Sequence, residues 1–184
     1  MKKIGLYLIW IAALTLTTCN DDTDDTAATE AWKLANEQTF NAIASNPAYT
    51  ELKSPGNTGS IYYRVLEKGE GTKPVYYTSV VSFYYKGWFV ASNATGSITK
   101  GQIAGQKLFD DGEPLAVEVS SAYLREGLQI ALQHMVKGDK WEVWIPSHLA
   151  GQMTDTDVPT FSTPAFSTLA FEIEVREVYG IDDL

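Results

Sequence analysis

The sequence predicts an α+β domain, an antiparallel sheet with one central helix, within a chain of 184 residues. Residues 169–175 place large apolar side chains at every second position, as a half-buried strand does. Residues 79–90 are rich in the β-branched and aromatic side chains that favour strands. Between them, residues 124–135 carry apolar side chains at i, i+4, i+7, i+8 and i+11, which lie on one face of a helix. Strands combined with one such helix indicate the α+β class.

The first predicted element of the folded part is a helix over residues 27–44. Asp25 or Thr26 can cap its N-terminus, and Asn46-Pro47 ends it. Its apolar residues fall on one side at helical spacing: Trp32, Ala35, Phe40 and Ile43. A lone helix of this length is marginal in water, so this stripe must be buried against another surface.

Strand patterns follow a turn-rich linker over residues 53–60. Residues 61–66 and 79–90 are predicted strands. Residues 91–105 are small, polar and glycine-rich, and they are predicted to form a long loop. Residues 115–119 are predicted to form the next short strand.

The central helix is predicted over residues 121–135. Ser120 or Ser121 can cap it, and Gly138 ends it. Its apolar face carries Leu124, Leu128, Ala131, Leu132 and Met135. A second polar loop is predicted over residues 152–164, before the last strand.

The strand over residues 141–145 contains two tryptophans three positions apart, which must face opposite sides of the sheet. Trp141 shares its side with Val143 and Ile145, so it is predicted to point into the core. Trp144 is then on the outer face, where it could stack on a glycan or receive the N-terminal helix. Because the central helix occupies the inner face, the N-terminal helix is expected to pack on the outer one.

The N-terminus has the features of an export signal. Lys2 and Lys3 precede an apolar run over residues 4–16, which is too short to span a bilayer. Cys19 follows at once and is the chain's one cysteine, an arrangement that resembles the lipobox of bacterial lipoproteins. The prediction is a signal peptide over residues 1–18 and a lipid-modified Cys19. A plain secretory signal and a chance cysteine are the alternatives.

An acidic segment follows the cysteine and contains Asp21, Asp22, Asp24 and Asp25. It is expected to be a solvated tether, and it resembles the surface-export signal of Bacteroidetes lipoproteins. Residues 19–59 are therefore predicted to form a lipid-anchored acidic tether with the N-terminal helix, and residues 60–184 the folded domain. The expected location is the outer membrane, on its periplasmic or its surface side, with the acidic segment favouring the surface.

Composition excludes several classes of function. The net charge is −9 and the 14 Lys and Arg form no basic run, so no nucleic-acid partner is expected. One cysteine allows neither a disulfide framework nor a cysteine zinc cluster. Residues 110–113 are acidic but lack the ligand spacing of a calcium loop. With two histidines and no nucleophile beside a base, neither a metal, a cofactor nor a catalytic triad is expected.

The order of several short motifs carries more information than any one of them. Along the chain these are Tyr85-Lys86-Gly87, Leu108-Phe109-Asp110, a helix with Gly127, Met135-Val136-Lys137-Gly138, Ile145-Pro146-Ser147-His148-Leu149-Ala150 and Ser167-Thr168-Leu169-Ala170-Phe171. This series resembles the FKBP-type peptidyl-prolyl cis-trans isomerase family over about residues 60–179.

The resemblance implies a strongly bent sheet wrapped around the central helix, with a shallow apolar pocket for a proline ring between them. Eight residues are predicted to line the pocket: Tyr85, Phe109, Asp110, Leu115, Leu124 and Phe171 match pocket positions of the family, and Arg125 and Leu128 lie at two further pocket positions. Tyr85 and Phe171 match its aromatic walls, and the Asp110 carboxylate matches the group that orients the pocket. Without the resemblance, Tyr85 and Phe171 would be interpreted as core residues.

The sequence departs from the family pattern at three pocket positions. Arg125 replaces an isoleucine whose backbone amide receives a substrate carbonyl, and it is expected to make the local surface cationic. Leu128 replaces a tryptophan at the pocket floor, and Gly151 replaces a tyrosine hydroxyl donor. The segment from Trp88 to Leu108 is also longer than usual. These changes predict a wider pocket and low activity rather than none.

The resemblance implies isomerisation of X-Pro bonds in exported or envelope proteins, a reaction that needs no acid, base or metal. Proline-containing polypeptides are then the substrates. A membrane is contacted through the lipid anchor, and outer-membrane proteins are candidate partners. The alternative is an isomerase-like surface lipoprotein of weak or no activity that binds a peptide, a glycan or a partner protein.

Overall fold

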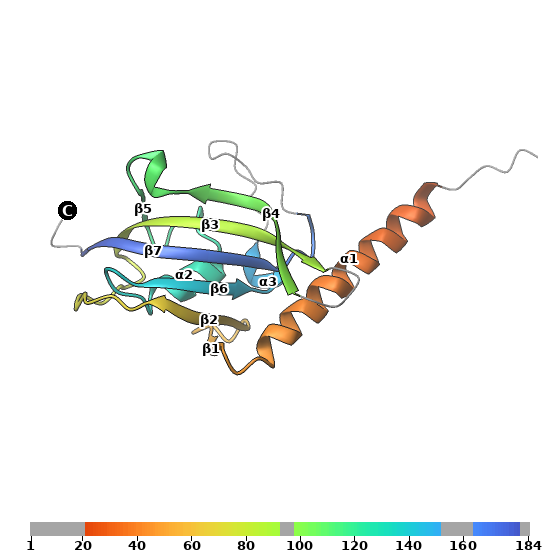
Figure 1. Ribbon diagram of the computed structural model, residues 1–184, viewed down its shortest axis with the longest axis horizontal. Coiled ribbons are helices and arrows are strands. Elements are labelled where there is room, and N and C mark those ends of the chain that lie inside the picture. Colours follow the sequence, from red (N-terminus) through yellow and green to blue (C-terminus); the bar gives the residue numbers. More distant parts are fainter. Residues whose placement is uncertain (1–20, 93–97, 152–163, 181–184) are drawn as a thin grey trace, which may run out of the picture.

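The computed structural model describes residues 21–92, 98–151 and 164–180, which form a bent sheet with helices on both of its sides (Figure 1). The helices are α1 (Asp21–Ala44), α2 (Glu126–Leu132) and α3 (Ser147–Ala150), with a 3-10 turn at Phe109–Asp111. The strands are β1 (Thr50–Lys53), β2 (Ser60–Glu67), β3 (Val80–Ser92), β4 (Ile98–Lys107), β5 (Leu115–Glu118), β6 (Lys140–Ile145) and β7 (Leu169–Tyr179).

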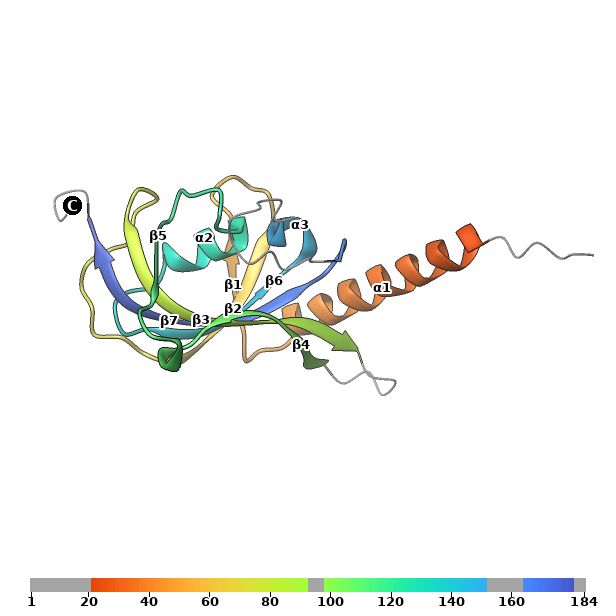
Figure 2. The same ribbon diagram turned by 90° about the horizontal axis from the view of Figure 1, so that it is seen from above.

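All seven strands form one antiparallel sheet in the order β1-β2-β6-β7-β3-β4, with β5 also paired to β3. Figure 2 shows the sheet curving around α2, while α1 leaves it at one end. The predicted α+β class, with a central helix and an added N-terminal helix, is confirmed. The sheet begins at Thr50, before the predicted domain start at residue 60, because β1 pairs with β2.

The inner face of the sheet holds the main core. β7 lies between β6 and β3, and its alternate residues Phe171, Ile173 and Val175 are buried. Trp141 lies on this side and stacks on Tyr63 with ring centroids 4.1 Å apart. The predicted inward orientation of Trp141 is therefore confirmed.

The outer face receives the N-terminal helix. Ile43 of α1 is buried against Val90, Trp144 and Ala170. Two turns nearer the N-terminus of the helix, the Asn36 side-chain oxygen accepts a hydrogen bond of 2.8 Å from the backbone N–H of Thr168. The helix thus docks where the sequence predicted.

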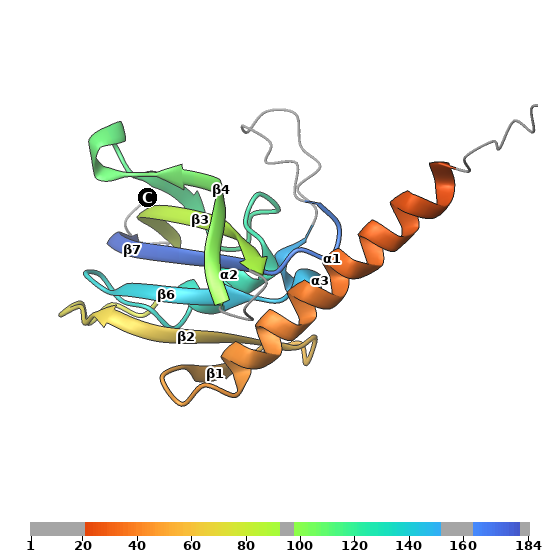
Figure 3. The same ribbon diagram turned by 45° about the vertical axis from the view of Figure 1, so that its right-hand side comes forward.

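Two details of the N-terminal helix differ from the prediction. Trp32 and Phe40 are half-buried rather than fully buried, because α1 crosses one end of the sheet and projects beyond it (Figure 3). The helix also begins at Asp21, so the residues predicted as a tether extend it. None of the helices in the described ranges is both long and apolar enough to cross a membrane.

The predicted loop over residues 91–105 is wrong. β3 continues to Ser92, and β4 pairs back along it from Ile98 to Lys107. The pairing has register shifts at Trp88, and among the described side chains of β4 few are buried, so the strand lacks a clean apolar alternation. Strand formation depends on the neighbouring strand more than on intrinsic propensity, which is why composition missed β4.

The central helix is shorter than predicted. α2 covers Glu126–Leu132, and tight turns replace the helix on either side of it. Leu124 N donates to Ser121 O before α2, and Met135 N donates to Leu132 O after it. These i→i+3 bonds keep Leu124 and Met135 on the buried side, so the apolar spacing of a longer helix persists without one.

Candidate functional site

An apolar cavity of about 500 Å³ lies between the concave side of the sheet and α2. Six of the eight predicted pocket residues line it: Tyr85, Leu115, Leu124, Arg125, Leu128 and Phe171. They come from β3, β5, β7 and the α2 region, so no short segment of the chain could build this site alone. A volume in this range suits a small ring with part of its peptide neighbourhood.

Two aromatic rings form one wall. Tyr85 and Phe171 lie on adjacent strands with ring centroids 6.4 Å apart and planes inclined by 51°. Burial raises the pKa of the Tyr85 hydroxyl, so this group stays a neutral donor at physiological pH. The wall therefore presents two ring surfaces and one hydroxyl to the cavity.

Gly87 allows the Phe171 ring to lie where it does. The two residues are direct partners across β3 and β7. A Cβ atom built on Gly87 would lie 2.5 Å from Cε1 of Phe171, closer than real side chains approach each other. The glycine of the Tyr-Lys-Gly motif is thus required by close approach of the ring.

The floor comes from α2 and the turn before it. Leu124 and Leu128 are buried and face the cavity. Gly127 lies against Ile145 of β6, and a Cβ on it would be 2.4 Å from the Ile145 Cγ2 atom. The missing side chain lets α2 pack closely on the sheet, which fixes the depth of the floor.

Phe109 and Asp110 do not line this cavity, which corrects the predicted pocket. Phe109 is 69% exposed and packs edge-on against Tyr84, with centroids 5.7 Å apart. Tyr84 and Tyr85 are consecutive in β3 and therefore point to opposite faces of the sheet. Phe109 and Asp110 border a shallower hollow on the outer face, beside Lys140.

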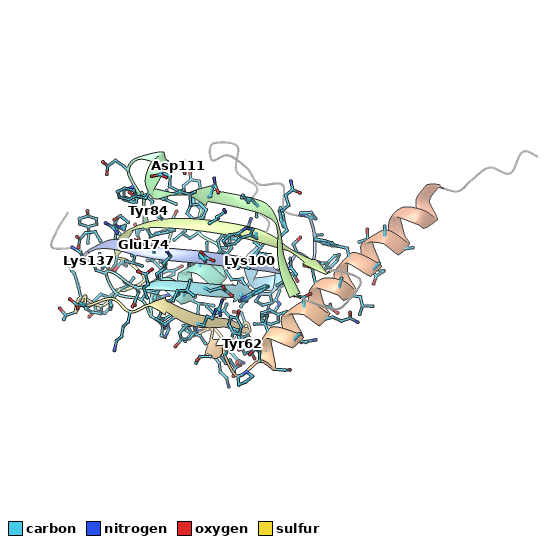
Figure 4. The ribbon with its side chains drawn as sticks, viewed as in Figure 1. Tyr62, Tyr84, Lys100, Asp111, Lys137 and Glu174 are labelled. Carbon is cyan, nitrogen blue, oxygen red and sulfur yellow. The ribbon has the colours of Figure 1, made fainter. Side chains whose placement is uncertain are left out.

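The β3–β4 pairing explains this position. β4 stays paired with β3 until Lys107, which is opposite Tyr85. The turn that follows is closed by its own bonds: Asp111 accepts from Leu108 N at 2.7 Å, and Tyr84 donates to Gly112 O at 2.9 Å. Tyr84 and Asp111 lie close together at this end of the sheet (Figure 4). The motif is thereby held outside the cavity.

Arg125 differs from its prediction as well. Its side chain does not form a cationic surface, because the residue is only 6% exposed. Its Nη1 donates to the backbone carbonyls of Ala150 and Gly151 at the end of α3. Burial lowers the pKa of Arg125, although guanidinium groups remain protonated in proteins. The cavity wall therefore contains one buried cation.

Sequence reasoning did not name nine of the lining residues: Phe83, Ala104, Gly105, Ala116, Val117, Glu118, Ser121, Tyr123 and Leu169. Two of the nine are Ala104 and Gly105 of β4. They lie in the segment predicted as a loop, and their residue types gave no signal of a binding site. Within the described ranges, no group of three or more His, Cys, Asp or Glu side chains could hold a metal ion. The site can bind an apolar ring and remove water from the amide beside it.

Comparison with known proteins supports this interpretation of the site. The model of the family described as FKBP-type peptidyl-prolyl cis-trans isomerase matches residues 73–176, which is more than half of the chain. A curated relative is the FKBP-type 22 kDa peptidyl-prolyl cis-trans isomerase of Escherichia coli (strain K12). It is 32% identical over 118 residues, which cover 64% of this chain and 50% of the relative. The match thus spans about half the length of that relative.

Solved structures show the same fold. A peptidyl-prolyl cis-trans isomerase from Pseudomonas syringae pv. tomato superposes with a TM-score of 0.61 at 28% identity, covering 83% of this chain and 96% of that one. FkpA from Escherichia coli superposes with a TM-score of 0.57 at 24% identity, covering 86% and 66% of the two chains. At the lower identity the likeness concerns the fold alone.

Proposed function

The chain belongs to the FKBP-type peptidyl-prolyl cis-trans isomerase family, and on that premise we propose that it isomerises X-Pro bonds of exported or envelope proteins. The observation that carries the proposal is the apolar cavity walled by Tyr85 and Phe171. Its aromatic and aliphatic lining suits a proline ring, which is apolar and compact. Residues 60–184 are assigned as the isomerase domain, with α1 and β1 packed on it.

The proposed reaction needs neither an acid, a base nor a metal. Rotation about an X-Pro bond has to overcome about 18–20 kcal/mol, because it destroys amide resonance. The planar amide has more charge separation than the twisted one, so an apolar cavity disfavours the planar form relative to the twisted form. Tighter binding of the twisted amide lowers the barrier without any proton transfer.

We assign roles in this scheme to five of the lining residues. Tyr85 and Phe171 hold the proline ring between them, Leu124 and Leu128 support it from below, and Leu115 covers it at the rim. With leucine at position 128, the floor is smaller than a tryptophan would make it. The ring is then held less tightly, so we expect low isomerase activity.

A pair of variants tests the assignment. Leu115 and Phe109 are both exposed, 38% and 69%, so the alanine variants of both should fold. Leu115→Ala removes part of the cavity rim and is expected to lower kcat/KM on X-Pro peptides about three- to tenfold. Phe109→Ala is the matched control and should leave kcat/KM unchanged, because that ring lies on the outer face.

The rates are measured by exchange NMR on proline peptides, with dissociation constants measured in parallel. A loss of activity in Phe109→Ala but not in Leu115→Ala would contradict the site. A wild-type protein that binds these peptides without accelerating their isomerisation would support the alternative of a binding protein with an isomerase-like fold.

We propose further that residues 1–18 are cleaved and that Cys19 carries a lipid anchor in the outer membrane. The apolar run before the chain's one cysteine supports this proposal. The helix α1 begins at Asp21, two residues after Cys19, and its 24 residues span roughly 36 Å at 1.5 Å per residue. A lipid on Cys19 would then hold the cavity at a distance from the membrane.

Cys19→Ser tests the anchor. We expect this variant to move from the membrane fraction to the soluble fraction and to lose the mass of the lipid. A variant that stays in the membrane fraction with an unchanged N-terminal mass would refute the lipoprotein assignment. Protease accessibility on intact cells then distinguishes the surface side from the periplasmic side.

A further inference from the structure

The first turn of α2 is tied to the turn that joins β1 and β2. Glu126 is the first residue of α2, and its Oε1 atom accepts a hydrogen bond of 3.2 Å from the Ser54 hydroxyl. The same oxygen accepts a hydrogen bond from the Thr58 hydroxyl. One carboxylate oxygen thus joins the helix to residues that lie 72 and 68 positions earlier in the chain.

The β1–β2 turn is closed by its own backbone bonds. The N–H of Ser54 donates to the carbonyl oxygen of Gly59 at 2.9 Å, and the N–H of Asn57 donates to the carbonyl oxygen of Ser54 at 3.0 Å. Asn57 has φ of +54° and Gly59 has φ of +146°, and asparagine and glycine are the residues that adopt positive φ most readily. Ser54 is buried. The turn therefore has a defined shape and can support a neighbouring element.

α2 depends on such support. It has seven residues, and a helix this short is not stable by propensity alone, so tertiary contacts fix its position. Gly127 makes one of these contacts, against Ile145. Glu126 and Leu128 are about 200° apart around a helix of 3.6 residues per turn. Because Leu128 faces the cavity, the bonds of Glu126 hold α2 from its opposite side.

The turn before α2 is fastened to the helix. The Gln129 side chain donates to the carbonyl oxygens of Ser121 and Leu124 at 3.1 and 3.3 Å. A displacement of α2 would therefore carry Leu124 with Leu128. Both residues belong to the floor of the cavity, so the floor moves as one unit.

We propose that Glu126 is a positioning residue: bonded to the β1–β2 turn, it sets where the cavity floor lies relative to the aromatic wall. This role rests on the proposed isomerase function and adds a residue to it. Glu126 is not among the described residues that line the cavity, so it acts through Leu124 and Leu128. Ser54 and Thr58 precede residues 73–176, which match the family model. The support of the floor thus comes from the N-terminal segment that contains β1.

Three variants test this role, each assayed at a temperature at which urea unfolding shows it to be folded. Glu126→Ala removes both bonds and should lower kcat/KM on X-Pro peptides about five- to tenfold, because a displaced floor holds the proline ring less well. Glu126→Gln keeps an oxygen that can accept from both hydroxyls, so its kcat/KM should stay within about twofold of wild type. Thr58→Val keeps the shape of the side chain but removes one donor, so its kcat/KM should lie between those of wild type and Glu126→Ala.

The methyl chemical shifts of Leu124 and Leu128 report the position of the floor directly. They should change in Glu126→Ala and return to the wild-type values in Glu126→Gln. Ser60→Ala is the matched control, because it removes a hydroxyl of the same hairpin that bonds to Glu51 of β1, at 2.7 Å, rather than to α2. It should leave kcat/KM and both methyl signals unchanged, whatever its effect on the free energy of unfolding.

Wild-type kcat/KM and unchanged methyl signals in Glu126→Ala would overturn the proposal. A Glu126→Gln variant as impaired as Glu126→Ala would overturn it too, since the two hydrogen bonds would then not be the cause. A wild type that accelerated no peptide would contradict the isomerase function instead. The methyl signals and the dissociation constants of the same peptides would in that case still decide the role of Glu126.

Discussion

Gly87→Ala is expected to lower the free energy of unfolding by about 1–3 kcal/mol, as overpacking of a filled core does. It should also lower isomerase activity about tenfold, because the Phe171 ring forms a wall of the cavity. A Cβ at position 87 would lie 2.5, 2.8 and 3.1 Å from three carbon atoms of that ring. Three close contacts on one side of a buried ring leave it no adjustment except displacement. Denaturant unfolding and the isomerisation rate measure the two effects.

A double-mutant cycle tests whether the loss of stability in Gly87→Ala comes from the contact with the Phe171 ring. Phe171→Ala alone should lower the free energy of unfolding by about 3–5 kcal/mol, as large-to-small changes of buried aromatic residues do. Once the ring is gone, the methyl group introduced by Gly87→Ala has room, so the double variant should be about as stable as Phe171→Ala. Gly56→Ala is the control, because the nearest atom to its Cβ would be 3.6 Å away. If the losses from Gly87→Ala and Phe171→Ala simply add, the clash is not the cause.

The sequence predicted the position of a strand and its inward-facing side chains most accurately where one face of the strand is buried and the other is not. β7 has this property along most of its length, and its alternation gave its position and its inward residues. The same period of two separated Trp141 from Trp144 in β6, although both faces of that strand are buried, and it left the outer face for α1. Each of these predictions depends on periodicity alone, and periodicity survives changes in neighbouring elements.

β4 and the Phe109 turn could not be predicted in this way. β4 consists mainly of small and polar residues, and it is held by pairing with β3 rather than by an apolar face. Whether Phe109 lies inside or outside the cavity depends on how far this pairing runs, which no local pattern encodes. The motif order identified Phe109 and Asp110 as site residues, but the longer connection places them on the outer face.

The burial of Arg125 could not be predicted from the sequence, for a different reason. A cationic residue in sequence is normally expected in solvent, because burial of an unpaired charge is costly. Two groups that accept hydrogen bonds from it are the Ala150 and Gly151 carbonyls, some 25 residues later in the chain. Only the packing of α2 beside α3 brings them together, so the burial of Arg125 follows from tertiary structure.

Glu142 is the second position at which we expect a large effect, because it joins the connection between α1 and β1 to strands β2, β4 and β6. The residue is 2% exposed and lies on the outer face of β6. One carboxylate oxygen accepts from the Tyr49 hydroxyl at 2.5 Å and from Trp144 Nε1 at 2.8 Å. The other pairs with Arg64 at 2.9 Å and with Lys100 at 3.1 Å. All four partners favour the ionised form.

These partners decide the pKa. Burial by itself would raise the pKa of Glu142, but the hydrogen bonds from Tyr49, Trp144, Arg64 and Lys100 outweigh it and lower the pKa from 4.5 to about 2. The bond with Glu142 acts in the opposite direction on Tyr49, where burial and this carboxylate together raise the pKa to about 12. Both groups therefore keep their bonded forms across the physiological range.

Glu142→Gln should therefore lower the free energy of unfolding at pH 7 by about 2–3 kcal/mol. A carboxylate whose pKa falls on folding stabilises the native state fully above its unfolded value near 4.5, and this contribution disappears as the pH drops toward 2. Urea unfolding should accordingly show the largest gap between wild type and variant above pH 5, closing toward pH 2. Glu174→Gln, which removes a more exposed ion pair with Arg176, should cost no more than about 1 kcal/mol. A gap for Glu142→Gln that stayed constant from pH 7 to pH 2 would show that the charge of Glu142 does not stabilise the fold. The remaining loss would then come from packing around Tyr49 and Trp144 at the base of α1.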